Sequence, residues 1–251
     1  TCVVCVGPLV APVELPCGHA YCGSCLEELR SKRVAQACPL CRAELPPGVE
    51  GLFELALRID LRIEGMVDRG EASWASLPSA EQEEMEQAVA MWTEAAAQGH
   101  TGAQFCLGLA YHEGLGVTQD VDRAIELYTQ AGQQEGYSVA HYALGHPLQH
   151  KRGDVDGAEK AFRTAIQADP GFVLAHPRLT RLLLDRALKR QDEDGDPAKA
   201  AALYEEAAVH YTLVAGPEDE SVQQMKEGAA QLRAGDAASA RNTRREGGTP
   251  R

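Results

Sequence analysis

The sequence of 251 residues has little of what several large classes of protein require. It contains no run of about 18 apolar residues, the length that a membrane-spanning helix needs, so we expect no membrane segment. Acidic residues outnumber basic ones 37 to 24, which gives a net charge of −13 and disfavours a nucleic-acid surface. It also lacks a Gly-rich phosphate loop after a strand, and any Ser-His-Asp or paired-carboxylate arrangement typical of enzymes.

Cysteine is nearly absent beyond residue 41, where Cys106 stands alone, but it is dense before that point. Two thiolates of a Cys-x2-Cys pair lie on one tight turn, and two such pairs can close one tetrahedral zinc site. Eight ligands predict two closed structural sites with no open position for a catalytic water, although buried or disulfide-bonded cysteines are the alternative. The eight residues are Cys2, Cys5, Cys17, His19, Cys22, Cys25, Cys38 and Cys41.

The order of these residues, three cysteines, one histidine and four cysteines, resembles the RING finger over residues 2 to 42. The resemblance implies that the pairs interleave along the chain. One zinc ion would be held by Cys2, Cys5, Cys22 and Cys25. The other zinc ion would be held by Cys17, His19, Cys38 and Cys41. Metal would then hold together a segment too short to bury a sizeable core.

The resemblance also implies an activity, because most RING domains bind a ubiquitin-conjugating enzyme that carries ubiquitin and promote transfer to a substrate without a covalent intermediate. The positions that match the docking residues of RING domains are Val4, Leu29 and Pro39. Arg42, directly after the last cysteine, matches the cationic residue that holds the thioester in one closed geometry. Cys106 lies in a helical apolar stripe, where we expect a buried, inert thiol.

Residues 1–48 contain four basic and four acidic residues, so the acidity lies downstream. The sequence begins at Thr1, and we expect the natural N-terminus to lie further upstream. Zinc-spaced cysteines suit a reducing compartment, the cytosol or the nucleus. The segment 52–66 fits two patterns, a period of two typical of a strand and a helical stripe of Leu52, Leu55, Ile59 and Met66. We favour a helix, because no partner strand is evident.

From residue 79 the chain repeats itself. Ser79 to Gln82 reads as a capping box before a helix whose predicted buried stripe is Met85, Ala88, Val89, Trp92, Ala95 and Ala96. Gly99, Ala103, Leu107 and Gly108 recur 37 residues later as Gly136, Ala140, Leu144 and Gly145. A period of 34 to 37 residues with small residues and one aromatic per helix predicts stacked helix pairs.

Residues 86–146, with Trp92 to His100, Leu107-Gly108 and Gly114 to Val117, resemble the Sel1-like repeat. From Gly153 the pattern resembles the tetratricopeptide repeat, with Ala158, Phe162 and Asp169-Pro170 at matching positions. We expect Pro147 to cut its helix short, and Pro177 to kink its helix or set its start. The seven histidines outside the zinc motif lack paired metal spacing, and we interpret them as framework or surface residues.

These observations predict a small zinc-stabilised RING domain followed by an all-α helical-repeat solenoid. The expected parts are a RING finger at 1–48, a helical linker at 49–78, Sel1-like repeats at 79–146, tetratricopeptide-like repeats and a cap at 147–234, and a disordered tail at 235–251. We expect a RING-type ubiquitin ligase that contains two Zn²⁺ and binds a protein or peptide substrate on its repeats. The alternative is a non-catalytic scaffold that uses the RING only for assembly.

Overall fold

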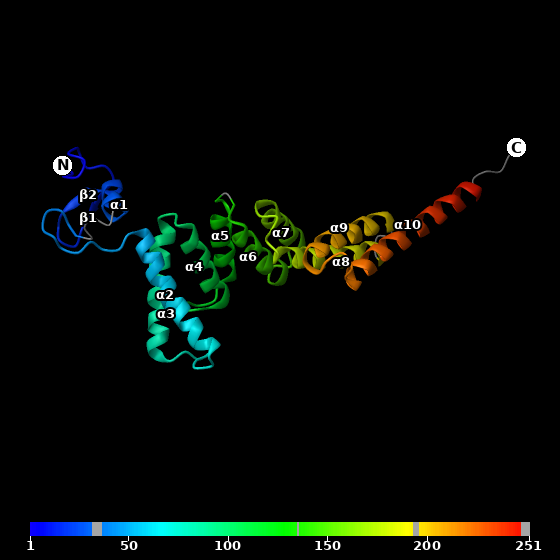
Figure 1. The fold of residues 1–251 in the computed structure, drawn as a ribbon, viewed down its shortest axis with the longest axis horizontal. Helices are drawn as coiled ribbons and strands as arrows, with labels where there is room; N and C mark the ends of the chain where they lie inside the picture. The colour runs from blue at the N-terminus through cyan, green and yellow to red at the C-terminus, as the bar shows by residue number, and fades with distance from the viewer. Residues whose placement is uncertain (32–36, 135, 193–195, 247–251) are drawn as a thin grey trace. The chain divides into compact units, whose positions relative to one another are not determined.

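The chain was analysed as a computed structural model, which describes residues 1–31, 37–134, 136–192 and 196–246 (Figure 1). It divides into two compact units, Thr1–Thr118 and Gln119–Arg251. The first runs from blue to green in Figure 1 and the second from green to red. Within the described residues, no helix combines the length and the apolar character needed to cross a membrane.

The first unit begins with a small hairpin and one short helix. Strands β1 (Pro12–Glu14) and β2 (Ala20–Cys22) pair antiparallel with Val13 opposite Tyr21, and α1 (Gly23–Ser31) follows directly. Among the described residues, the core around them contains eight buried residues, and four of these are cysteines. They are Cys2, Leu15, Tyr21, Cys22, Cys25, Leu26, Cys38 and Leu45. Too few apolar side chains are buried here to stabilise the segment by themselves.

The rest of the first unit is helical, with α2 (Val49–Asp68), α3 (Ser79–Ala97) and α4 (Thr101–Glu113). The ambiguous segment 52–66 therefore lies in a helix, α2, and this helix packs along α3. The predicted stripe is only partly correct, since α2 buries Leu52, Ala56 and Ile63 whereas Leu55 is 39% exposed. Ala56 lies on the buried face of α2 because its small side chain lets α2 and α3 approach closely.

Helix α3 buries five of the six residues predicted for its stripe, which are Met85, Ala88, Val89, Trp92 and Ala95. Its start differs from the prediction. The N-cap residue is Pro78, and no side-chain hydrogen bond caps the helix. The capping box fails because the helix begins at Ser79 itself, so the serine is already inside the first turn instead of at the cap.

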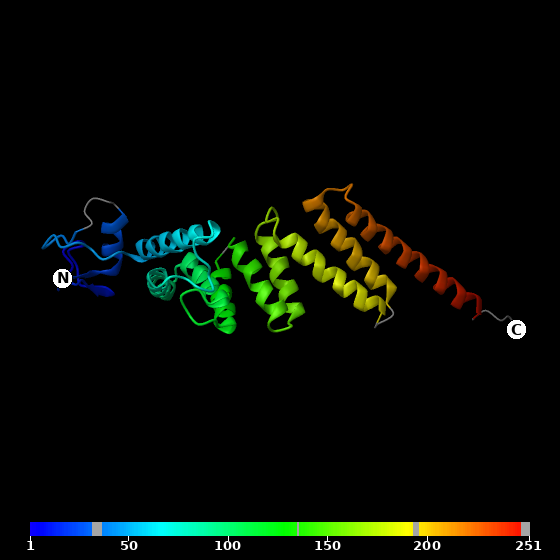
Figure 2. The same ribbon diagram turned by 90° about the horizontal axis from the view of Figure 1, so that it is seen from below.

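In the second unit, the described residues form six further helices, and each packs against the next (Figure 2). They are α5 (Val121–Gly132), α6 (Ser138–His150), α7 (Val155–Ala168), α8 (Ala175–Asp192), α9 (Pro197–Ala215) and α10 (Glu220–Glu246). Asp120, Asp154 and Asp196 cap α5, α7 and α9, and each carboxylate accepts from the backbone N–H three residues later. Aspartate at this position satisfies an otherwise unpaired donor and suits the positive end of the helix dipole.

Phe162 on α7 fills the space between neighbouring helices. It is 1% exposed and its ring centroid lies 5.9 Å from that of Tyr142 on α6. Gly145 on α6 makes room for the ring, since a Cβ atom built there would lie 2.5 Å from Phe162 Cε1. The glycine and the aromatic are therefore one packing unit.

One prediction for this unit was wrong. Pro147 does not cut α6 short, because the helix continues to His150. A proline lacks an N–H and crowds the carbonyl four residues before it, so the turn that follows it can still form, and here the Pro147 carbonyl accepts from the N–H groups of Lys151 and Arg152. Helix α10 extends to Glu246 through most of the segment predicted to be disordered, and its Ala- and Arg-rich sequence favours a helix. Residues 247–251 lie outside the described residues. Pro177 lies in the first turn of α8, so it sets the start of its helix, which is one of the two effects predicted for it.

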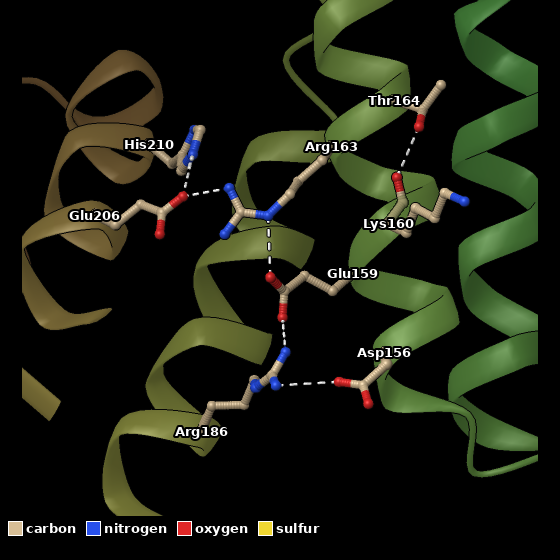
Figure 3. Close-up of polar contacts among 8 residues, drawn as sticks. All are labelled: Asp156, Glu159, Lys160, Arg163, Thr164, Arg186, Glu206 and His210. Atoms are coloured by element: carbon tan, nitrogen blue, oxygen red, sulfur yellow. Dashed lines mark hydrogen bonds and ion pairs between the residues drawn. The ribbon is translucent and has the colours of Figure 1, made fainter. Parts of the chain in front are cut away.

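A chain of ion pairs links α7, α8 and α9 (Figure 3). Glu159 on α7 accepts from Arg163 Nε at 3.0 Å and also pairs with Arg186 on α8. Arg163 in turn pairs with Glu206 on α9 and holds the pKa of that carboxyl below its usual range. Single exposed pairs stabilise little, but a connected set fixes the register of three helices at once.

Candidate metal centre

The sulfur atoms of Cys2, Cys5, Cys22 and Cys25 gather at one point, within 4.8 Å of one another. Cys5 Sγ lies 3.8 Å from Cys22 Sγ. A zinc–sulfur bond of about 2.3 Å in a tetrahedron places two sulfurs about 3.8 Å apart, whereas a disulfide bond would bring them to about 2.05 Å. The four thiols therefore have the spacing of one zinc site, and all eight cysteines of the chain are free of disulfides.

The second cluster consists of Cys17, His19, Cys38 and Cys41, whose ligand atoms also lie within 4.8 Å of one another. His19 Nδ1 is 3.6 Å from both Cys17 Sγ and Cys38 Sγ. Bonds of about 2.3 Å to sulfur and 2.0–2.1 Å to nitrogen give about 3.6 Å for this edge of a tetrahedron. The geometry fits zinc bound through Nδ1 of the imidazole.

The fold interleaves the two sites. The turn between β1 and β2 carries Cys17 and His19 to the second site, while the end of β2 and the first turn of α1 carry Cys22 and Cys25 to the first. Isolated bridges, Cys2 with Gly7 and Ala37 with Glu44, close the remaining two turns. Both sites are complete with four protein ligands, so the two Zn²⁺ ions are structural.

Tyr21 supports the second site from the core. Its hydroxyl lies 3.0 Å from Cys38 Sγ, and both side chains are buried. Burial alone would raise the pKa of the Cys38 thiol, but hydrogen bonds from Tyr21 and from the backbone N–H groups of Cys41 and Leu40 lower it to about 6. Donors of this kind favour the thiolate, which is the form that binds metal.

Replacing Tyr21 by phenylalanine is expected to weaken zinc binding at the second site by about 10- to 100-fold, because it removes a donor to a ligating sulfur while keeping the ring. Competition with a coloured zinc chelator would measure this, and the other site provides an internal reference. Tyr211→Phe, a tyrosine of the second unit, is the matched control. Equal weakening at both sites would mean that Tyr21 acts through the core instead of through Cys38.

The other predicted residues of this region lie in three separate segments. Val4 and Leu29 are partly buried and pack against the small core, whereas Pro39 is exposed. Arg42 is exposed and has a φ of 61°, a left-handed conformation that is uncommon for a residue other than glycine. Its N–H donates to the carbonyl of Cys38 at 2.8 Å. The zinc turn therefore fixes the backbone of Arg42.

The structure adds exposed apolar residues that the sequence reasoning did not single out. Val6 is 86% exposed, Val10 is 67% exposed and Leu40, next to Pro39, is 54% exposed. The sequence could have indicated these residues, because it places them inside or beside the zinc-binding turns. Such a density of exposed aliphatic side chains on a small domain is typical of a protein-binding surface.

Cys106 and the remaining histidines belong to neither of the two groups of potential metal ligands that occur in the described part of the chain. Burial raises the pKa of the Cys106 thiol to about 12, so this cysteine is a poor nucleophile. His100 caps α4 by accepting from the N–H of Ala103. His176 Nδ1 lies 3.1 Å from His210 Nδ1, between α8 and α9. These histidines have framework roles.

The comparison with known families agrees with the geometry of the zinc-binding residues. Residues 2–41 match the family described as zinc finger, C3HC4 type (RING finger). Residues 80–100, 101–135 and 188–208 match the Sel1 repeat. The third match lies in the region where the sequence favoured a tetratricopeptide-like pattern. The chain thus contains a RING-type zinc region followed by an all-α body with Sel1 repeats.

Curated relatives are similar over the RING region. E3 ubiquitin-protein ligase TRIM65 of Homo sapiens is 44% identical over 57 residues, 23% of this chain and 11% of that protein. E3 ubiquitin-protein ligase RNF114 of Mus musculus is 43% identical over 61 residues, 24% of this chain and 25% of that protein. The chain therefore spans between about a tenth and a quarter of the length of these relatives.

Among solved structures, a Sel1 repeat protein from Oxalobacter formigenes is similar with a TM-score of 0.44 and 20% identity, over 82% of this chain and 84% of that chain. The protein c5321 of uropathogenic Escherichia coli, which displays an SLR fold, gives a TM-score of 0.44 and 18% identity, over 75% of this chain and 38% of that chain. Likeness at this level does not carry a function from one protein to the other.

Proposed function

We propose that this chain is a RING-type ubiquitin ligase that recruits a ubiquitin-conjugating enzyme through its zinc region and a substrate protein through its helical repeats. The observation that carries the proposal is the exposed Arg42, whose backbone is fixed by the second zinc turn. Its guanidinium pairs with no acidic side chain within the described residues. It is therefore free to donate to partner carbonyls, which its planar fork suits.

The mechanism needs no nucleophile from this chain. A substrate lysine amine attacks the thioester carbonyl on the conjugating enzyme, the C–S bond breaks and an isopeptide bond forms. Arg42 would hold ubiquitin and the conjugating enzyme in one geometry, which lowers the entropic part of the barrier. The seven metal-binding cysteines and the poorly reactive Cys106 leave no thiol suited to a covalent intermediate.

The docking surface proposed for the conjugating enzyme consists of Val4, Leu29 and Pro39. Each lies on a different segment, the first zinc turn, α1 and the last zinc turn, and the two metal sites hold these segments together. Zinc would then act by positioning the surface, without chemistry of its own. We expect the protein to act in a reducing compartment, the cytosol or the nucleus, where thiolates stay available for metal.

Self-ubiquitination in a purified system with a panel of conjugating enzymes tests the proposal. Arg42→Ala is expected to lower the rate by at least about tenfold, which corresponds to about 1.4 kcal/mol of lost stabilisation, and Arg42→Lys to recover only part of it. Arg58→Ala, an exposed arginine on α2, is the matched control. Cys38→Ser should abolish activity because it opens a zinc site.

The non-catalytic scaffold is the alternative, and the same assay separates the two. A zinc-loaded wild-type chain that is inactive with every conjugating enzyme would support the scaffold. Activity that survives Arg42→Ala unchanged would leave a ligase but remove the role given to Arg42.

A further inference from the structure

Two histidines meet between α8 and α9 in the second unit. His176 on α8 is 3% exposed, and its Nδ1 atom lies 3.1 Å from Nδ1 of His210 on α9. On the other side of its ring, His176 Nε2 lies 3.2 Å from the carbonyl oxygen of Pro170. A carbonyl oxygen only accepts hydrogen bonds, so Nε2 of His176 carries a hydrogen and Nδ1 of the neutral ring is bare. The hydrogen between the two rings therefore belongs to Nδ1 of His210.

This arrangement has room for one additional proton but not for two. With its hydrogen on Nδ1, the neutral ring of His210 turns a bare Nε2 toward Glu206, whose Oε1 lies 3.9 Å away (Figure 3). A first proton on that nitrogen would face a carboxylate, which favours it. A second proton would have to bind Nδ1 of His176, where it would meet the N–H of His210 across 3.1 Å. Two donors at that distance repel each other, and no acceptor is left between them.

The surroundings of His210 oppose the first proton as well. The charged and titratable groups around the ring are Arg163 of α7, His176 of α8 and Glu206 of its own helix. Burial lowers the pKa of His210, and the charges of His176 and Arg163 lower it further, whereas Glu206 raises it. The folded pair therefore binds protons less readily than two histidines in water do.

The pair lies beside a close contact between α8 and α9. Thr180 of α8 donates to the carbonyl of Ala207 on α9 at 3.5 Å, and Ala207 is fully buried. Helix α10 packs against α9 in turn, and its Arg233 pairs with Glu205 of α9. Repulsion between the two histidine rings would therefore act on the contact that attaches the last two helices to α8.

We propose that His176 and His210 form a pH-sensitive latch, which holds α9 and α10 on α8 at neutral pH and loosens them at mildly acidic pH. In the unfolded chain each ring takes up a proton as the pH falls through about 6.5, whereas the folded pair accommodates at most one. Because the unfolded chain then binds more protons, the latch stabilises the fold fully above that pH and loses strength below it. The latch belongs to the helical body and does not depend on the proposed ligase function.

Hydrogen exchange followed by mass spectrometry tests the latch on the zinc-loaded full chain. Protection of α9 would be compared at pH 7.5 and pH 5.5, on either side of the ordinary histidine pKa of about 6.5, after correction for intrinsic exchange rates. We expect protection to fall by at least about tenfold, since each proton that only the open state binds changes the equilibrium about tenfold per pH unit. Helix α3, which contains no histidine, should change by less than about threefold.

Two variants locate the effect. The double variant His176→Gln/His210→Asn keeps amide donors near both positions but binds no proton, so the fall in α9 protection should shrink to less than about threefold. His150→Asn removes an exposed histidine from the end of α6, and it should keep the whole fall seen in the wild type.

NMR of the ring nitrogens is a second measurement, and it needs no variant that could fail to fold. At pH 7.5 we expect the hydrogen on Nε2 of His176 and on Nδ1 of His210. On acidification the pair should take up protons in two steps that differ by more than about one pH unit. Protonation of both rings in one step near about pH 6.5, α9 protection that does not fall, an equal fall in α3, or a fall that persists in the double variant would each overturn the proposal.

Discussion

Removing zinc with a chelator is expected to unfold residues 1–45 and to leave the helices from α2 onward folded. The physical reason is the composition of the small core, in which four of eight buried residues are cysteines. A structural zinc ion contributes an apparent binding free energy of about 10–16 kcal/mol in small metal-dependent domains, far more than so few apolar side chains can supply. Limited proteolysis with mass spectrometry would locate the unfolded segment, and circular dichroism would follow the helices.

Several controls make this result specific. Because α1 has nine residues and α2 to α10 make up most of the chain, the helical signal should fall only slightly. Added zinc should restore protection, and Cys106→Ser should respond to the chelator as the wild type does because Cys106 belongs to neither zinc cluster. A proportional loss of helical signal along the whole chain would contradict the prediction, since it would make the repeats depend on metal.

Truncation of Phe162 to alanine is expected to destabilise the second unit by about 3–5 kcal/mol. The ring is 1% exposed and packs in the core that α7 shares with Leu179, Leu182 and Leu183 of α8. The surrounding helices cannot close the gap easily, because ion pairs through Glu159 and Arg163 hold their register (Figure 3). Urea unfolding followed by circular dichroism would measure the change, with bound zinc as a check that the first unit is unaffected.

Val209→Ala is the matched control, since this side chain is 63% exposed on α9 and its loss should change stability by less than about 0.5 kcal/mol. The partner of Phe162 offers a sharper check. Gly145→Ala should be costly next to the intact ring, but it should cost less in the Phe162→Ala background, where the space is vacant. If Phe162→Ala lowered the free energy of unfolding by less than about 1 kcal/mol, the surrounding helices would be closing the gap freely, against the prediction.

The sequence was informative where the chemistry is local. Cysteine pairs at zinc spacing and one aromatic per repeat gave the metal ligands and Phe162, because both depend on a fixed number of residues along the chain. The sequence was ambiguous for α2, because the same residues fit both the period of two of a strand and the stripe of a helix. It missed the end of α6, since Pro147 does not prevent the turn that follows it.

A cavity of about 190 Å³ in the first unit, which Asp60 and Trp92 help to line, could not be found in the sequence. Its walls come from three helices and a joining segment, so the lining residues are set by how the helices pack and not by their spacing. The backbone of Arg42 is a similar case. The sequence identifies the residue by its place after Cys41, but its left-handed conformation follows from the closed zinc turn.

The same core that depends on metal is also built from the atoms that oxidants attack. Each zinc site has one exposed cysteine, Cys5 in the first and Cys41 in the second, while partner sulfurs lie behind them. An oxidant that reaches an exposed thiolate would convert it to a sulfenic acid, which condenses with a neighbouring thiol such as Cys22, 3.8 Å from Cys5. The resulting disulfide ejects the metal. Peroxide would thus unfold the surface that we propose for docking the conjugating enzyme, and a thiol reductant would be needed before zinc could rebuild it.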